Sequence, residues 1–563
     1  MKRFFLPLRN VLSLGFFLAA GALAYGEYFY TDDPEFLALT HISRRMGRTL
    51  PFSSFPVHGG DLLDYAEELL ALPGAETLDE ADRLMLGELI AGLGEPRDRG
   101  IRIQGSLTLA YEHRLQTGSF TIDGEEVPNG EDFRRAFLNF SPVLSLRAGA
   151  GVFDGPWIAG ELNFRPPWEG DYAPSSNFFS KVDISYDILK RGILAWNGRY
   201  LNFFLGRDTV HWGNPRGATF YPSALLPYLD SLRLNVPLGP FSFDYLLGAI
   251  IPRKAPRDVY DVNYDPNPPA PGKPYTDYFG FLHDPNPSTI LAAAHRLQWN
   301  FGPLKAGIGG TVVYVRSNNA FHITDVLPVM IYHNADLTPN NLSLIVDLSW
   351  TVLPGLDLSA MAGFDDISAR IFGIPDGDTP TIPAAVLQLE YSAAADALTQ
   401  YYMLEGGYTH YLWGNYAFDD PPFTQSEARL ARALYRYTAN KNAALLPLTS
   451  PYGPGTIWGR FLGNFRFPRR HIRAGIEMLF LVKNSEVNLV DIPYESNEGL
   501  AGYDRWFFAL DLPLTYTWKN LDVSLKPSLL WGTGGRALEC TLGLKWTLGG
   551  AGYLSPLRRS YPL

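Results

Sequence analysis

Residues 342–365, LSLIVDLSWTVLPGLDLSAMAGFD, place apolar side chains at every second position on both sides of a Pro354-Gly355 turn. The apolar positions are Leu342, Leu344, Val346, Leu348, Trp350, Val352, Leu356, Leu358, Ala360, Ala362 and Phe364. The positions between them include Ser343, Asp347, Ser349, Thr351, Asp357, Ser359, Met361, Gly363 and Asp365. Because successive side chains of a strand point to opposite faces, this stretch predicts a β-hairpin with one apolar and one polar face.

The same period of two recurs from Ile101 to Gly549. Short turns such as Gly302-Pro303 and Lys519-Asn520 alternate with long polar loops such as residues 252–288. This alternation predicts an up-and-down meander with tight turns at one end and extended loops at the other. Counting the alternating segments gives roughly 18 strands, within about two.

A soluble antiparallel sandwich would also alternate, so the aromatic residues decide between the two architectures. The apolar faces end repeatedly in Trp, Tyr or Phe near the turns, as in the aromatic girdle of a membrane barrel. The tryptophans on these faces are Trp299, Trp350, Trp518, Trp531 and Trp546. A sheet that spans hydrocarbon has to close on itself, because unpaired backbone groups are costly there. The sequence therefore predicts an all-β membrane barrel, an up-and-down antiparallel transmembrane β-barrel of roughly 18 strands.

The N-terminal part of the chain differs from the rest. Basic residues precede a short apolar run, which predicts a signal peptide over residues 1–24. The alternative, an anchoring helix, needs roughly 18 to 20 apolar residues, more than the run supplies. Residues 25–98 have helical spacing in three segments and predict a small periplasmic helical bundle, with Asp33 and a Thr77–Glu80 capping box starting two helices. The barrel is expected over residues 99–550, followed by a tail over residues 551–563.

Composition limits the function. The chain of 563 residues has a formal net charge of -11 and no basic stripe, which argues against nucleic-acid binding. Its one cysteine, Cys540, excludes a disulfide or a Cys-based zinc site within the chain. No metal or cofactor is expected, and no enzymatic activity, since the sequence contains no G-x-S-x-G, H-E-x-x-H or phosphate-binding Gly loop. The expected location is the cell outer membrane, with lipid and the barrel-assembly machinery as partners.

Residues 206–233 are rich in side chains that could bind a ligand. The candidate ligand contacts are Arg207, Asp208, His211, Trp212 and Arg216. The two arginines could each donate paired hydrogen bonds to a carboxylate or to sugar hydroxyls, and Trp212 offers an apolar face to a sugar ring. Equally, Arg207, Asp208 and His211 could form a satisfied polar cluster in the barrel wall, with the glycines that follow shaping a bend.

The pattern GRxxxxWGxxxG, which runs from Gly206 to Gly217 within a barrel, resembles the Wzi family of capsule-assembly outer-membrane proteins. A second match is GRTLPFSSFPVHGGDLLDYAEEL, residues 47–69, a Gly–Pro–Pro loop that opens a helix. The resemblance implies an 18-stranded barrel with a periplasmic helical bundle, acting as a surface lectin that holds capsular polysaccharide. The alternative function is a substrate-selective porin or outer-membrane transporter.

Charged side chains on the polar strand faces are expected to face the lumen. They are Arg296, Lys305, Arg460, Arg466, Arg473, Glu477, Lys483, Lys526 and Lys545. Their basic excess could favour anionic solutes, or the charges could pair across strands and fill the pore. The acidic and aromatic loop around Tyr260 and Asp265 could bind glycan or calcium, or be an ordinary solvated loop.

Overall fold

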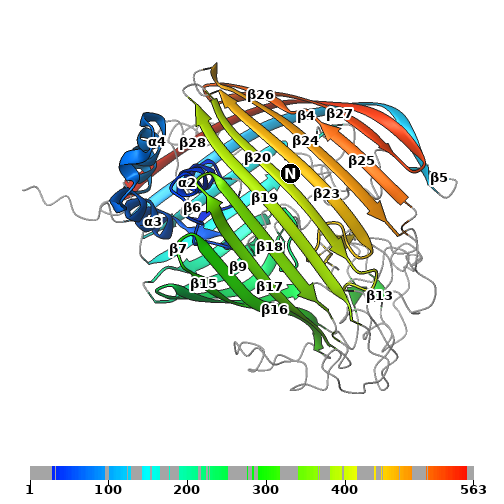
Figure 1. Cartoon of the computed structure of the whole chain (residues 1–563), viewed down its shortest axis with the longest axis horizontal. Coiled ribbons are helices and arrows are strands. Elements are labelled where there is room, and N and C mark those ends of the chain that lie inside the picture. The colour runs from blue at the N-terminus through cyan, green and yellow to red at the C-terminus, as the bar shows by residue number, and fades with distance from the viewer. Residues whose placement is uncertain are drawn as a thin grey trace, which may run out of the picture.

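The computed structural model shows a closed β-barrel with helices at one end (Figure 1). The residues that it describes are 28–31, 33–94, 101–122, 125–127, 142–152, 155–164, 176–177, 189–198, 200–213, 217–223, 226, 228–250, 275–276, 282–283, 289–316, 340–365, 367, 381–395, 398–414, 437–438, 445–446, 448–467, 470–484, 503 and 505–554. The predicted signal peptide, the loop around Tyr260 and Asp265, and residues 555–563 of the predicted tail lie outside the described residues.

The strands of the barrel wall run antiparallel and follow one another in sequence order. Their bounds are β4 (Ile101–Ile122), β5 (Glu125–Val127), β6 (Leu144–Gly151), β7 (Pro156–Phe164), β8 (Leu189–Trp196), β9 (Asn202–Asp208), β11 (Leu229–Leu238), β12 (Phe241–Ile250), β15 (Thr289–Asn300), β16 (Leu304–Arg316), β17 (Asn340–Leu353), β18 (Leu356–Phe364), β19 (Pro383–Ala395), β20 (Leu398–Thr409), β23 (Thr456–Phe467), β24 (Ile472–Lys483), β25 (Arg505–Asp511), β26 (Leu514–Trp518), β27 (Leu521–Gly532) and β28 (Gly535–Leu554). Short paired strands outside the wall are β1 (Tyr28–Phe29), β2 (Ser54–Phe55), β3 (Val57–His58), β10 (His211–Trp212), β13 (Tyr275–Thr276), β14 (Leu282–His283), β21 (Tyr437–Thr438) and β22 (Leu445–Leu446).

Two of the wall strands are interrupted. β5 and β6 both pair with β4, while β25 and β26 both pair with β24 and β27. Each of these couples forms one strand of the wall, so the described residues make an antiparallel barrel of 18 strands. The predicted fold class and strand number are confirmed.

The hairpin of residues 342–365 has the predicted sidedness. The apolar side chains of its first strand are well exposed: Leu344 43%, Val346 42%, Leu348 37% and Trp350 44%. The side chains between them are buried: Ser343 0%, Ile345 0%, Asp347 4% and Ser349 7%. The outer face of this hairpin therefore presents hydrocarbon side chains to lipid, and the polar face is covered from inside the barrel.

β28 closes the barrel by pairing with β4, from Gly535 opposite Phe120 to Leu554 opposite Ile101. Figure 1 shows the red end of the chain beside the blue and cyan β4. β28 continues to Leu554, past the boundary at residue 550 that the sequence predicted. None of the described helices is long and apolar enough to cross a membrane.

Three helices precede the barrel. They are α2 (Pro34–Arg45), α3 (Gly59–Ala71) and α4 (Glu80–Gly94), and the short 3₁₀ helix η1 (Ala75–Thr77) lies between the last two. Their apolar faces share a buried core that includes Leu39, Ile42, Leu62, Leu69 and Leu86. In Figure 1 the three helices lie together at one end of the barrel.

Asp33 is the N-cap residue of α2, as predicted, whereas the cap of α4 differs from the prediction. The Asp33 carboxylate accepts a hydrogen bond from the backbone N–H of Tyr30 at 2.7 Å and none from the helix that follows. The helix α4 begins at Glu80, and the Asp79 carboxylate accepts from the N–H of Asp82 at 2.8 Å. Because Asp79 occupies the capping position, the predicted Thr77–Glu80 capping box is wrong.

Candidate functional site

The N-terminal segment, which comprises the described residues 28–31 and 33–58, contacts the barrel at the end that carries short turns. The backbone N–H of Thr49 donates to the carbonyl of Gly302, in the β15–β16 turn, at 2.9 Å. The N–H of Gly355, in the β17–β18 turn, donates to the carbonyl of Arg44 at 2.8 Å. The N-terminal segment is therefore tied to the backbone of two neighbouring turns.

Arg44, in the last turn of α2, anchors the N-terminal segment to the inner wall. Its side chain is buried and forms ion pairs with Asp357 on β18 and with Glu390 on β19. Burial alone would lower the pKa of Arg44, but the carboxylates of Glu390 and Asp357 outweigh burial and raise it. The three side chains stabilise one another, because each buried charge would be costly without its partner.

Two cations that the sequence placed in the lumen also hold the N-terminal segment. Lys305 Nζ donates to the backbone carbonyls of Leu50 at 2.7 Å and of Phe52 at 3.1 Å. Arg296 is fully buried, donates from Nη1 to the Ser53 hydroxyl at 2.5 Å, and forms a two-point ion pair with Asp347 at 3.0 and 2.6 Å. Both cations are thus buried and bound to groups of the protein itself, so they are not available to a solute passing through the barrel.

A second segment lies inside the barrel and is called the lumen segment; it consists of the described residues 209–213, 217–223, 226 and 228. Its strand β10 pairs with β2 of the N-terminal segment, so both segments contribute to one small sheet. The N–H of Ala218 donates to the Glu405 carboxylate on β20 at 3.0 Å. One buried apolar cluster joins the lumen segment to the inner faces of β11, β12, β15, β16, β17, β18, β19, β23, β24, β25, β27 and β28. The lumen segment therefore packs against the inner faces of these strands and occupies part of the interior.

Arg207 and Asp208 lie on opposite sides of the wall. β9 pairs with β8 and β11 without a register shift, so Arg207 stays on the outward side and Asp208 faces inward. Arg207 forms a two-point ion pair with Asp230, at 2.7 and 2.8 Å. Asp208 is 1% exposed and accepts hydrogen bonds from Arg191 at 2.7 Å and from the Tyr30 hydroxyl at 2.6 Å.

His211 and Trp212 belong to the lumen segment and are buried. Trp212 is 2% exposed, and its ring packs against Tyr221 at a centroid distance of 6.2 Å. Arg216 lies outside the described residues. Of the described candidates Arg207, Asp208, His211 and Trp212, Trp212 alone lines the cavity between residues 51–58 and the barrel wall. The contacts of these four residues match the interpretation as satisfied polar and packing groups. Their predicted role in ligand binding stays a prediction.

Close contacts explain two glycines of the GRxxxxWGxxxG pattern. A Cβ atom at Gly217 would lie 2.0 Å from the Glu405 carboxylate, which also accepts from Trp458 Nε1 at 3.0 Å. A Cβ atom at Gly206, where φ is 133°, would lie 2.1 Å from the carbonyl oxygen of Gly192. Glycine at 217 lets the lumen segment pack against β20, and glycine at 206 lets β9 approach β8 closely.

The remaining predicted lumen charges have mixed environments. The ion pairs among them are Arg460–Glu477 at 2.6 Å, Arg473–Asp522 at 3.2 Å and Lys526–Asp511 at 4.0 Å. Lys483 is buried, whereas Arg466 and Lys545 are exposed. Arg460 and Glu477 lie on neighbouring strands, which is the cross-strand pairing that one of the two interpretations predicted.

No family model matches the sequence, and no curated protein matches it significantly. Among solved structures, one match is Wzi of Escherichia coli, described as an outer membrane protein involved in group 1 capsule assembly and as a carbohydrate-binding β-barrel. The alignment covers 92% of this chain and 99% of Wzi, with a TM-score of 0.54 and 10% identity. The chain shares its fold with Wzi. The predicted resemblance to Wzi is thus confirmed at the level of an outer-membrane β-barrel fold.

Two further matches are outer membrane protein OpdK of Pseudomonas aeruginosa and OccAB4 of Acinetobacter baumannii. OpdK aligns over 80% of this chain and 99% of its own, with a TM-score of 0.38 and 10% identity. OccAB4 aligns over 81% of this chain and 100% of its own, with a TM-score of 0.36 and 11% identity.

Proposed function

We propose that this protein is an outer-membrane lectin that binds surface polysaccharide, as in capsule assembly, and that it catalyses no reaction. The observation that carries the proposal is the obstructed barrel, in which the N-terminal and lumen segments pack against the inner wall through buried, paired side chains. A substrate-selective porin needs a water-filled path through the barrel. The obstructed interior therefore favours binding over conduction, and the description of Wzi as carbohydrate-binding supports the same choice.

We also propose that the helices lie in the periplasm. Outer-membrane barrels have short periplasmic turns and longer extracellular loops. The N-terminal segment hydrogen-bonds to the short turns at Gly302 and Gly355, which supports this orientation.

The test of the lectin function is retention of polysaccharide by the purified full-length protein. Protein immobilised in detergent is expected to retain polysaccharide extracted from the surface of its own cells. An open-pore barrel immobilised at the same density serves as the control and is expected to retain none. Equal retention by the two proteins would contradict the proposed function.

A further inference from the structure

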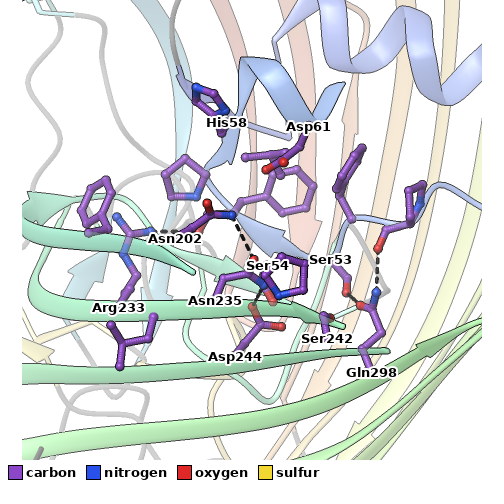
Figure 2. Close-up of a pocket in the computed structure, with 18 of the residues that line it drawn as sticks. Ser53, Ser54, His58, Asp61, Asn202, Arg233, Asn235, Ser242, Asp244 and Gln298 are labelled. Carbon is purple, nitrogen blue, oxygen red and sulfur yellow. Dashed lines mark hydrogen bonds between the residues drawn. The ribbon is translucent and has the colours of Figure 1, made fainter. Parts of the chain in front are cut away.

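A half-open cavity lies between the N-terminal segment and the barrel wall and is called the seam cavity (Figure 2). Its volume is about 230 Å³. Residues 51–58 and Asp61 form one side, and inward-facing residues of β9, β11, β12 and β15 form the other. Pro237 and Gly239 of the β11–β12 turn also line it, so the cavity lies near the short-turn end of the barrel.

A row of polar side chains crosses the barrel side of the seam cavity. Asn202, Asn235 and Asp244 lie opposite one another on neighbouring strands. Asn202 Nδ2 donates to Asn235 Oδ1 at 3.1 Å, and Asn235 Nδ2 donates to Asp244 Oδ1 at 2.7 Å, as Figure 2 shows. These hydrogen bonds fix the orientation of the row, so the cavity is preorganised for a polar ligand.

Hydrogen-bonding atoms in the same cavity have no partner among the described residues. The Nδ2 atom of Asn197 is buried, while its Oδ1 accepts from the Tyr28 hydroxyl. The Ser242 hydroxyl and the Asn300 Nδ2 also form no hydrogen bond within the part of the chain that the structure describes. The Asn197 side chain is buried, where polar groups are normally hydrogen-bonded, whereas the Ser242 and Asn300 side chains are partly exposed and can be reached from the cavity. All three side chains therefore favour a ligand that supplies hydroxyl groups.

Aromatic rings supply an apolar surface beside these polar groups. The aromatic residues of the lining include Tyr28, Phe52, Phe55, Phe204 and Trp212. A sugar ring carries hydroxyls at its edge and C–H groups on its faces, and therefore fits a cavity that combines both surfaces.

The charges of the lining favour a neutral ligand. Asp61 and Asp244 contribute carboxylates, whereas the described lining contains one guanidinium, Arg233. That guanidinium already donates to the carbonyl of Phe55 at 3.2 Å and lies 3.6 Å from Asp208. An anionic sugar would meet more negative than positive charge.

We propose that the seam cavity binds one neutral sugar unit, with Asn197, Ser242 and Asn300 as hydrogen-bonding contacts. The cavity is smaller than the roughly 300–1,000 Å³ that is typical of small-molecule sites, which limits the ligand to a single sugar residue. This site faces the short-turn end and its assignment does not rest on the polysaccharide binding proposed above, although Trp212, a candidate contact for that polysaccharide, belongs to its lining.

The test is binding of glucose, galactose, mannose and N-acetylglucosamine to the full-length protein in detergent, measured by saturation-transfer NMR. At least one of the four sugars is expected to bind. Asn300→Leu is expected to weaken that binding about fivefold, as loss of one hydrogen bond would. Asn464→Leu, the same change on β23 outside the cavity lining, is expected to leave it unchanged. Ser242→Ala removes only a hydroxyl and is expected to weaken binding even if Asn300→Leu fails to fold.

Absence of binding by all four sugars would overturn the inference, and so would equal weakening by Asn300→Leu and Asn464→Leu. Glucuronic acid is expected to bind more weakly than the neutral sugars, and equal or tighter binding would overturn the assignment of a neutral ligand. Protein that retains polysaccharide but binds no monosaccharide refutes this inference alone. The reverse result refutes the proposed lectin function alone.

Discussion

Arg44 shows how a single side chain can hold the N-terminal segment in the barrel. Arg44→Met would leave Asp357 and Glu390 buried without their cation. We expect this substitution to lower the free energy of unfolding by about 3–5 kcal/mol. Denaturant unfolding of the full-length protein in detergent measures the change.

Arg48 provides a matched control for Arg44. It is partly exposed and lies 3.5 Å from the exposed Glu68 carboxylate. Arg48→Met is therefore expected to change the free energy of unfolding by less than about 1 kcal/mol. Equal losses of unfolding free energy in the two variants would show that the buried ion pairs of Arg44 stabilise the protein no more than the exposed contact of Arg48 does.

Trp212 is predicted to contribute to stability in the same assay. Trp212→Ala would leave a cavity inside the barrel, and we expect a loss of about 3–5 kcal/mol. Trp212→Phe keeps a ring in the lumen, so the double variant Arg207→Ala, Trp212→Phe is suited to test their predicted ligand role. If this folded variant retains polysaccharide as well as the wild type, Arg207 and the Trp212 indole play no part in binding.

Sequence could not predict the partners of these residues. Arg44 and Arg45 end α2, where basic residues are favourable in any helix, and nothing local distinguishes the buried one. The carboxylate of Asp357 comes from a position 313 residues away in the chain. Only the closed barrel brings the two together.

At the scale of elements, α4 contributes a pH-dependent contact. Asp82 is 2% exposed, lies 3.2 Å from His41 Nε2 and is also paired with Arg45 at 3.5 Å. Burial tends to raise the pKa of Asp82, but the hydrogen bond and charge of His41 and the charge of Arg45 outweigh burial and lower it. The contact therefore stabilises α4 above the unfolded pKa of about 3.9 and is lost as pH falls through the folded pKa.

We predict that amide hydrogen exchange in residues 34–94 accelerates below about pH 4, relative to intrinsic rates. Asp82→Asn removes the charged partner and is expected to speed exchange at neutral pH and to flatten its dependence on acid. An unchanged acid dependence in Asp82→Asn would mean that another group controls the packing of the helices.

Elements were predictable where their pattern is local. Alternation over residues 342–365 fixes which side chains face outward, because a strand has only two faces. The cap of α4 was mispredicted because Thr77 and Asp79 both precede the apolar run, and the side-chain geometry that selects Asp79 is not visible in a pattern.

At the scale of the whole molecule, the strand count and the closure follow from the repeated alternation and from the physics of lipid. The obstructed interior does not. The Glu405 carboxylate accepts a hydrogen bond from the backbone N–H of Ala218, which is 187 positions away in the chain. In the sequence, Glu405 has the pattern of an ordinary wall strand and Ala218 that of an ordinary loop. The seam cavity could also be predicted only in part. Alternation predicts that its polar row faces inward, but nothing in the sequence predicts that residues 51–58 cover this row.

Ion conductance of the full-length protein in a planar bilayer tests the obstructed barrel most directly. We predict that inserted protein carries no steady open-channel current, because the N-terminal and lumen segments obstruct the interior. A steady wild-type current that a solute can block would contradict the obstructed interior and would instead indicate a porin.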